Sequence, residues 1–328
     1  MADIEEINYI TISNLAGVDG ILKVNISNIN GVDVPSASVG DRGIYGGGNE
    51  GSYTHRIQYI TISSIGNATD FGDLTVARGY LKACSNSTNE RGVFGGGLDS
   101  SSKKNIIDYI TINSTGNATD FGDLNNAVNG PSSCSNATNE RGVFAGGHDG
   151  TNYLNVIDYI TINSTGNAID FGDLTVARNK SGAVSNATNE RGVVIGGQAD
   201  GIVIDYITIN STGNAIDFGD TVQNTSTGGT SSNGTNERGV YGANTTINIQ
   251  YVTINSASNA TSFGDLTATR YGVAGNSNAT NERATFGGGF VSARSMIIDY
   301  ITINSTGNAT DFGDLASAIY YFSGTDNG

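Results

Sequence analysis

Short apolar and alternating segments recur along the chain at nearly constant intervals. One phrase, Tyr-Ile-Thr-Ile or Tyr-Val-Thr-Ile, has successive spacings of 50, 50, 47, 45 and 49 residues; it begins at Tyr59, Tyr109, Tyr159, Tyr206, Tyr251 and Tyr300. A second phrase, RGVFGGG and its variants, begins at Arg42, Arg91, Arg141, Arg191, Arg238 and Arg283. Residues 41–328 therefore hold six units that average 48 residues. A sequence period of this length indicates a repeat architecture, in which each unit is one supersecondary element.

Each unit contains four short segments with the composition of β-strands. In residues 91–140, RGVF ends at three glycines, and IIDYITIN is rich in β-branched and aromatic residues, as strands are. DFGDL is the third segment, and SSC, before the turn SNATNE, is the fourth. No segment has the 3.6-residue period of a helix. Four strands per unit predict the blade of a β-propeller; a β-helix, whose coils are shorter, and a sandwich, which need not repeat its sequence, are the alternatives.

The order of these segments predicts how the ring closes. The array opens at Arg42 without the innermost strand of its first blade, and residues 316–324 stand where such a strand is due. We expect them to pair with the strand that starts near Arg42, because this pairing removes two open sheet edges. Residues 32–40 are the competing candidate for the same position.

Each unit also resembles the kelch repeat, in which a strand ends in a Gly-Gly pair and two aromatic residues follow. In the second unit Gly95-Gly96-Gly97, Tyr109 and Phe121 hold these places. The last aromatic residue, usually Trp in kelch repeats, is Phe here: Phe71, Phe121, Phe171, Phe218, Phe263 and Phe312. Arginines that precede the innermost strand, another kelch-like feature, are Arg78, Arg178 and Arg270. The resemblance implies an all-β, six-bladed kelch-like β-propeller over residues 36–328, in a family of mostly binding scaffolds and few enzymes.

The repeated phrases DYITINSTGNATDFGDL and NATNERGVFGGG resemble those of repeat proteins carried by marine bacteriophages. This second resemblance implies a virion structural protein: a tail fibre or spike tip, or a surface decoration that touches the host. Such a protein is assembled in the host cytoplasm and exposed outside the cell after lysis. The alternative is a bacterial adaptor propeller that mediates protein–protein interaction.

Residues 1–35 lie outside the repeats. ISNLAGVDG at 12–20 is echoed by ISNINGVDV at 26–34, which is a period of 14 residues. So short a repeat cannot bury a core that offsets about 1–2 kcal/mol of chain entropy per residue. The segment is either a flexible leader with a marginal hairpin or an N-terminal docking arm. Such Ile/Val/Gly repeats resemble the attachment segments of phage fibre proteins, which implies contacts with virion proteins or with another copy of the chain.

Composition and charge mainly exclude classes of function. The 31 acidic residues against 16 Lys plus Arg give a net charge of −15, so we expect no binding to nucleic-acid phosphates. No stretch approaches 18 consecutive apolar residues, so no membrane insertion is expected. The start MADIEEI lacks the basic and apolar regions of a secretory signal. Cys84 and Cys134, one period apart, are interpreted as packing residues rather than a disulfide.

Catalytic and metal-binding motifs are missing from the sequence. It has two histidines and no HExxH, nucleophile elbow or Walker loop, so we expect neither an enzyme nor a cofactor. Recurring acidic pairs, such as Asp70 and Asp73, offer oxygen ligands for Ca²⁺. Hydrogen bonds from these side chains to loop amides are the alternative that we favour.

The differences between the units indicate where a target binds. In an antiparallel four-stranded blade, the 1–2 and 3–4 turns leave one face of the ring, and the 2–3 loops and 4–1 connections leave the other. The turns SNATNE and NSTGNAT are nearly identical between units, whereas the 2–3 loops and 4–1 connections differ in every unit. Variable loops on a rigid frame are a usual place for recognition; relaxed drift on an idle face is the alternative.

We expect this variable rim to bind a glycan or protein of the host surface. Tyrosines with polar neighbours suit such targets, and the few cations of an acidic chain gather there, which favours an acidic partner. The candidate residues are Tyr53, His55, Arg56, Tyr80, Lys82, His148, Tyr153, Arg270, Tyr271, Arg294, Tyr320 and Tyr321.

Overall fold

The chain divides into two units, residues 1–38 and residues 39–328. The computed structural model describes residues 12–18, 21–26, 28–29, 32–33, 40–199, 201–242 and 246–328. In the first unit β1 (Ile12–Val18) pairs with β2 (Ile21–Ile26), and β3 (Asn28–Ile29) pairs with β4 (Val32–Asp33), both antiparallel. The predicted docking arm, residues 1–35, falls in this unit, and its remaining residues lie outside the described ones.

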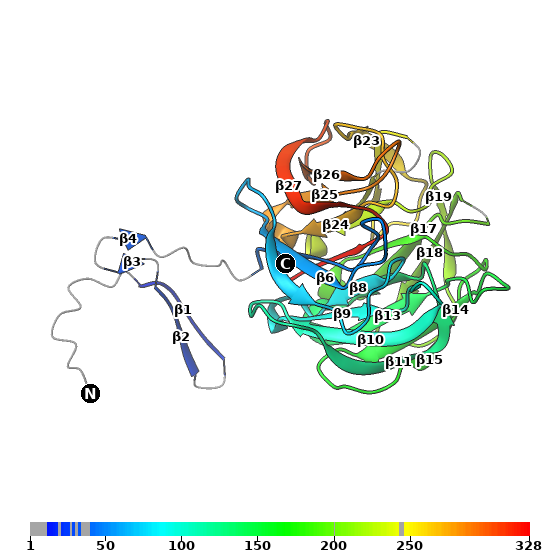
Figure 1. The fold of residues 1–328 in the computed structure, drawn as a ribbon, viewed down its shortest axis with the longest axis horizontal. Coiled ribbons are helices and arrows are strands. Elements are labelled where there is room, and N and C mark those ends of the chain that lie inside the picture. The colour runs from blue at the N-terminus through cyan, green and yellow to red at the C-terminus, as the bar shows by residue number, and fades with distance from the viewer. Residues whose placement is uncertain are drawn as a thin grey trace. The chain divides into compact units, whose positions relative to one another are not determined.

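The second unit is a six-bladed β-propeller (Figure 1), as the repeat count predicts. Each blade is a four-stranded antiparallel sheet whose strands follow one another from the axis outward. Blades 2 to 6 are β8 (Lys82–Ser85), β9 (Arg91–Gly95), β10 (Lys104–Thr111) and β11 (Thr119–Val128); β12 (Ser132–Ser135), β13 (Arg141–Ala145), β14 (Val156–Thr161) and β15 (Ile169–Asp173); β16 (Gly182–Ser185), β17 (Arg191–Ile195), β18 (Val203–Thr208) and β19 (Ile216–Asp220); β20 (Gly229–Ser232), β21 (Arg238–Gly242), β22 (Asn248–Thr253) and β23 (Thr261–Asp265); and β24 (Ala274–Ser277), β25 (Arg283–Gly287), β26 (Ser295–Thr302) and β27 (Thr310–Ile319).

Blade 1 joins the two ends of the ring. Its innermost strand is β28 (Ser323–Asp326), which pairs with β5 (Arg42–Gly46); β6 (Arg56–Thr61) and β7 (Thr69–Asp73) complete it. The predicted closure is confirmed, although residues 316–319 belong to β27 and the pairing begins only at Ser323. The competing assignment of residues 32–40 to this position is wrong, because β28 occupies it.

The join reproduces the bonding of an uninterrupted blade. The backbone N–H of Arg42 donates to Oδ1 of Asn327 at 2.8 Å. In blade 2 the N–H of Arg91 donates to Asn86 at 2.6 Å in the same way, across a short 3₁₀ turn, η1 (Ser87–Asn89). The turns η2 (Ala137–Asn139), η3 (Ala187–Asn189), η4 (Gly234–Asn236) and η5 (Ala279–Asn281) serve the other blades. The two ends of the propeller therefore meet where the other blades have this turn.

Glycines at the end of the second strand of a blade admit an aromatic ring from the next blade. A Cβ atom on Gly46 would lie 2.7 Å from the ring of Phe94, and one on Gly95 would lie 2.6 Å from the ring of Phe144. Phe94 is fully buried. Close packing leaves no space for a larger residue at these glycines, which explains why the phrase RGVFGGG recurs as a unit.

A second repeated contact ties each blade to the following one. In blade 2 the guanidinium of Arg91 lies 4.4 Å from the ring centroid of Tyr109 and donates to the carbonyl of Ile162 in blade 3 at 3.1 Å. The same cation–π pairs occur at Arg42, Arg141, Arg191, Arg238 and Arg283. The two recurring phrases of the sequence thus supply the cation and the ring of one cation–π contact. Such a contact contributes about 0.5–1 kcal/mol at exposed sites and more when buried.

Candidate binding surface

The variable segments meet on one face of the ring, as the blade geometry predicts. Among the described residues, five of the six 4–1 connections pair with the start of a 2–3 loop through a single β-bridge. These bridges join Gly79 to Leu98, Asn129 to His148, Asn179 to Gln198, Tyr271 to Phe290, and Asn49 to Tyr320. The 3₁₀ turns contact one another in sequence on the repetitive side. One rim therefore carries the diversity of the chain.

Two of the 2–3 loops are fixed by an aspartate at their base. Oδ1 of Asp99 accepts the N–H groups of Ser101 and Ser102, both at 2.8 Å, and its carboxylate pairs with Lys104 at 2.7 Å. The Lys104 ammonium and these amides hold the pKa of Asp99 well below its usual range. Asp149 accepts two amides of its own loop in the same manner. The rim is thus braced by hydrogen bonds that favour one loop conformation.

Four tyrosines from three different connections form one cluster on this rim, which we call the tyrosine cluster: Tyr80, Tyr271, Tyr320 and Tyr321. The rings of Tyr80 and Tyr321 stack with centroids 3.9 Å apart. Tyr320 and Tyr271 lie 4.5 Å and 5.8 Å from Tyr321. All four side chains are partly exposed. The cluster offers a preformed aromatic surface near the axis of the ring.

Two further side chains complete the cluster, and the sequence analysis did not select them. Phe290 lies 5.1 Å from Tyr320, and the ammonium of Lys180 lies 5.2 Å from the ring of Tyr80. Arg294, which was selected, lies 6.0 Å from Tyr320. Lys180 occupies the same place in its connection as Tyr80. An alignment of the 4–1 connections would therefore have identified it.

A closed ring of six backbone hydrogen bonds lies beneath these side chains, and we call it the axial ring. Each 4–1 connection supplies one residue, whose N–H donates to the carbonyl of its neighbour at 2.6–2.9 Å. In order, the members are Tyr80, Gly130, Lys180, Thr227, Gly272 and Tyr321. All six have φ between 56° and 70°, a left-handed conformation that costs a non-glycine residue about 1–3 kcal/mol. Such strain clusters at functional sites, and here it holds Tyr80, Lys180 and Tyr321 together.

Most of the other predicted rim residues lie apart from the tyrosine cluster, but Tyr53 borders it beside Tyr80. His148 and Tyr153 form a separate pair on blade 3, with ring centroids 5.3 Å apart. His55 is largely exposed, 3.8 Å from Asp73. The remaining two of blade 1 are Tyr53, which packs against Gly79, and Arg56, which pairs with Glu50 at 3.1 Å. Lys82 faces the axial channel.

Arg270 is not a surface residue, and its assignment to the rim is wrong. It is 2% exposed and pairs with Asp299 at 2.8 Å. Arg78 and Arg178 are likewise fully buried, and they pair with Asp108 and Asp205. The three arginines lie in variable segments, but their guanidinium groups point into the ring, where they join a connection to the blade that follows it.

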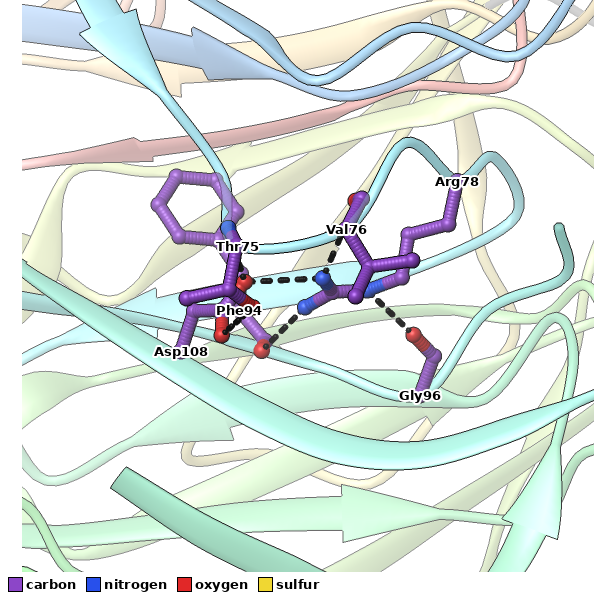
Figure 2. Close-up of polar contacts among 6 residues, drawn as sticks. All are labelled: Thr75, Val76, Arg78, Phe94, Gly96 and Asp108. Carbon is purple, nitrogen blue, oxygen red and sulfur yellow. Dashed lines mark hydrogen bonds and ion pairs between the residues drawn. The ribbon is translucent and has the colours of Figure 1, made fainter. Parts of the chain in front are cut away.

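Figure 2 shows how Arg78 is held. Its guanidinium donates to a carboxylate oxygen of Asp108 at 2.7 Å, to the carbonyl of Gly96 at 2.9 Å and to the carbonyl of Phe94 at 3.1 Å. Thr75 donates both its amide and its hydroxyl to Asp108. The charges of this pair are therefore compensated in a site without solvent, as a buried ion pair requires.

The residues at the positions of Arg78 and Asp108 vary together between blades. Where the first position is Arg, the second is Asp: Asp108 in blade 2, Asp205 in blade 4 and Asp299 in blade 6. Blade 5 combines Thr225 with Gln250, and blade 1 combines Ile319 with Gln58; each glutamine accepts the amide that the aspartate accepts elsewhere. Blade 3 departs from this rule, because Val128 stands opposite Asp158. Burial raises the pKa of Asp158, and no Lys or Arg of the described residues pairs with it.

We predict that Asp158→Gln stabilises the protein at neutral pH. With its pKa raised by burial, Asp158 favours the fold most below the unfolded pKa, about 3.9, and this stability is lost as the pH rises through the folded pKa. The glutamine should remove that loss and increase the free energy of unfolding at pH 7 by on the order of 1 kcal/mol. Urea unfolding between pH 4 and pH 8 measures it.

The control for this substitution is Asp205→Gln in blade 4. It leaves the guanidinium of Arg178 buried without its carboxylate, so it should destabilise the protein at the same pH. Stabilisation by both substitutions, or by neither, would contradict the assignment of Asp158 as an unpaired buried charge.

Comparison with known proteins does not place the chain in a family. No protein-family model matches it, and no curated protein matches it significantly. Within the described ranges, no group of three His, Cys, Asp or Glu residues is arranged to hold a metal ion. Nor does any helix of the described part of the chain have the length and apolar character needed to cross a bilayer. Cys84 and Cys134 are buried free thiols, as their interpretation as packing residues requires.

Proposed function

We propose that this protein is a non-catalytic recognition propeller of a virion, and that its variable rim binds a glycan or protein of the host surface. The observation that supports this most directly is the tyrosine cluster. Its members come from connections that are far apart in the chain, and they meet on the one face where the repeats differ. A scaffold that repeats its strands and turns and concentrates aromatic side chains at one point has the layout of a binding protein.

The chemistry of the cluster favours a target with flat apolar faces and some negative charge. Aromatic rings contribute large contact areas at little conformational cost, and their hydroxyls form hydrogen bonds. Burial raises the pKa of Tyr80 and of Tyr321, so both hydroxyls stay protonated and able to donate. Lys180 and Arg294 add positive charge beside the rings. An acidic sugar or an acidic protein loop matches this combination.

The proposed place of the protein is the virion, where residues 1–35 dock it to other virion proteins or to a second copy of the chain. The repeated phrases, which resemble those of bacteriophage repeat proteins, and the separate N-terminal unit support this part of the proposal. Mass spectrometry of purified particles tests it, with a chain that lacks residues 1–35 as the comparison. Recovery of the protein with bacterial partners, and not with particles, would instead favour the adaptor propeller.

We predict that the double substitution Tyr271→Ala and Tyr320→Ala weakens host binding at least thirtyfold. Truncation of an aromatic residue at the centre of an interface commonly costs about 2 kcal/mol or more, whereas residues at the edge cost little. These two residues are chosen because neither belongs to the axial ring, so the backbone beneath them should persist. Binding of the purified protein to host cells, with circular dichroism as the test of folding, measures the effect.

The matched control is Tyr153→Ala, because Tyr153 lies on the same rim, is 40% exposed and lies outside the tyrosine cluster. It should leave host binding nearly unchanged. A second control alters the SNATNE turns on the repetitive face. If the turn variant loses binding and the double tyrosine variant does not, the binding face has been assigned wrongly.

A further inference from the structure

The axial channel of the propeller contains a charged side chain that neither the fold nor the proposed binding face uses. The six innermost strands enclose a cavity of about 140 Å³. Most of its lining residues are Ser, Ala, Gly or Thr. Lys82, the first residue of β8, is the one basic residue among them. Its side chain also borders a smaller cavity of about 20 Å³ beneath the axial ring, which places it at the rim end of the channel.

The repeats show that Lys82 is a departure from a position that otherwise takes small residues. Its equivalents in blades 3, 4, 5, 6 and 1 are Ser132, Gly182, Gly229, Ala274 and Ser323. At Gly182 even a Cβ atom would lie 2.3 Å from Thr230. Because the spaces between blades are this tight, a lysine at the position has only the channel to extend into.

Lys82 has no partner in the described part of the chain, since neither an ion pair nor a hydrogen bond joins its ammonium to another residue. Lys82 keeps part of its exposure, but a partly desolvated cation without a counter-charge is still unfavourable. Desolvation lowers the pKa of Lys82 to about 8, so the side chain is still largely protonated at pH 7. The hydroxyls of Thr230 and Ser323 line the same channel and are able to donate hydrogen bonds beside it; that of Ser133 already donates to the carbonyl of Ala83 at 2.8 Å.

The channel also contains a carboxylate, but that group is already satisfied. Asp326 accepts the N–H of Ser277 at 2.8 Å and that of Gly328 at 3.3 Å. Asp326 ends the strand next to β8, and it lies three residues from the level of Lys82, which is roughly 10 Å along a strand. The two side chains do not form an ion pair, so the positive charge at the rim end is left without compensation.

We propose that the axial channel binds a small oxyanion, with a carboxylate, sulfate or phosphate head group held by the ammonium of Lys82 and the neighbouring hydroxyls. The axial ring narrows the channel at the rim, so the anion enters from the face of the 3₁₀ turns, where Ala137, Ala187 and Gly234 border the cavity. The cavity volume is ample for an anion of this size. This site is separate from the tyrosine cluster and does not depend on its function.

The test compares the full chain with two single variants. Lys82→Ser introduces the residue found at this position in blades 1 and 3, and Lys103→Ser removes the same charge from the rim. Calorimetric titration with sodium formate, sodium sulfate and sodium phosphate distinguishes the three head groups. We expect saturable binding of at least one anion, weakened tenfold or more in Lys82→Ser and unchanged in Lys103→Ser. Crystals grown with selenate should show an anomalous peak within hydrogen-bond distance of Nζ of Lys82.

Each other outcome contradicts the proposal. Equal binding in the parent and in Lys82→Ser would assign the anion to the surface. Binding of none of the three anions would exclude the site, as would a channel without an anomalous peak when sulfate is among the anions that bind. If Lys82→Ser does not fold, Lys82→Met keeps the length of the side chain without its charge, and the selenate crystal of the unaltered chain decides independently.

Discussion

Deletion of residues 322–328 is expected to destabilise the whole ring by several kcal/mol. The deletion removes β28, which leaves β5 with an unpaired edge, and it removes Phe322, which is 3% exposed and lies 5.6 Å from Tyr45. Loss of one buried phenylalanine side chain typically costs about 3–5 kcal/mol, and each lost hydrogen bond adds about 0.5–1.5 kcal/mol. Thermal unfolding and limited proteolysis measure the effect.

The control for this deletion removes residues 1–35 instead. These residues belong to a separate unit, so the Tm of the propeller should stay within a few degrees of that of the full chain. An unchanged Tm after removal of residues 322–328 would show that the join between the chain ends does not support the ring.

The second large effect is expected at Arg78 and Asp108. Asp108→Gln leaves a guanidinium that is fully buried without its counter-charge, which costs about 3–5 kcal/mol. The double substitution Arg78→Ile and Asp108→Gln introduces the pair found in blade 1, Ile319 with Gln58. It should restore most of the lost stability, because both buried charges are then removed together. Urea unfolding of the single and double variants forms the thermodynamic cycle that measures the coupling.

If the double variant is as unstable as the sum of its two single variants, the two residues do not act as a pair. The same exchange at Arg178 and Asp205 in blade 4 is an internal replicate, because the guanidinium there is equally buried.

The sequence was sufficient for the number of blades, the order of strands and the face on which variation gathers. These features follow from the repeat itself, since every unit must bury the same faces against its neighbours. The limits of single strands were less predictable. Residues 316–319 continue β27 instead of starting the closing strand, because the ten-residue outer strand includes part of the variable connection, as β11 does in blade 2.

The assignment of single residues to the rim was less successful, for a physical reason. Membership of a variable segment does not tell whether a long side chain points outward or back into the ring. Arg270 points inward because Asp299, which lies 29 residues later, offers it a buried carboxylate. The joint variation of Arg with Asp, and of Ile or Thr with Gln, was visible in the repeats and was the signal for this pairing. The approach of Tyr80 to Tyr321 depends on closure of the ring, which no local pattern encodes.

The axial ring has a consequence for how such a gene can change. It contains one backbone donor and one acceptor from every connection, and it closes with no group left over. A duplicated or deleted repeat would add or remove a member, so the ring would have to widen or narrow before its hydrogen bonds closed again. Point substitutions in the loops leave the circle intact. A change in the number of repeats therefore requires the whole axis to adjust, whereas a change in a loop does not.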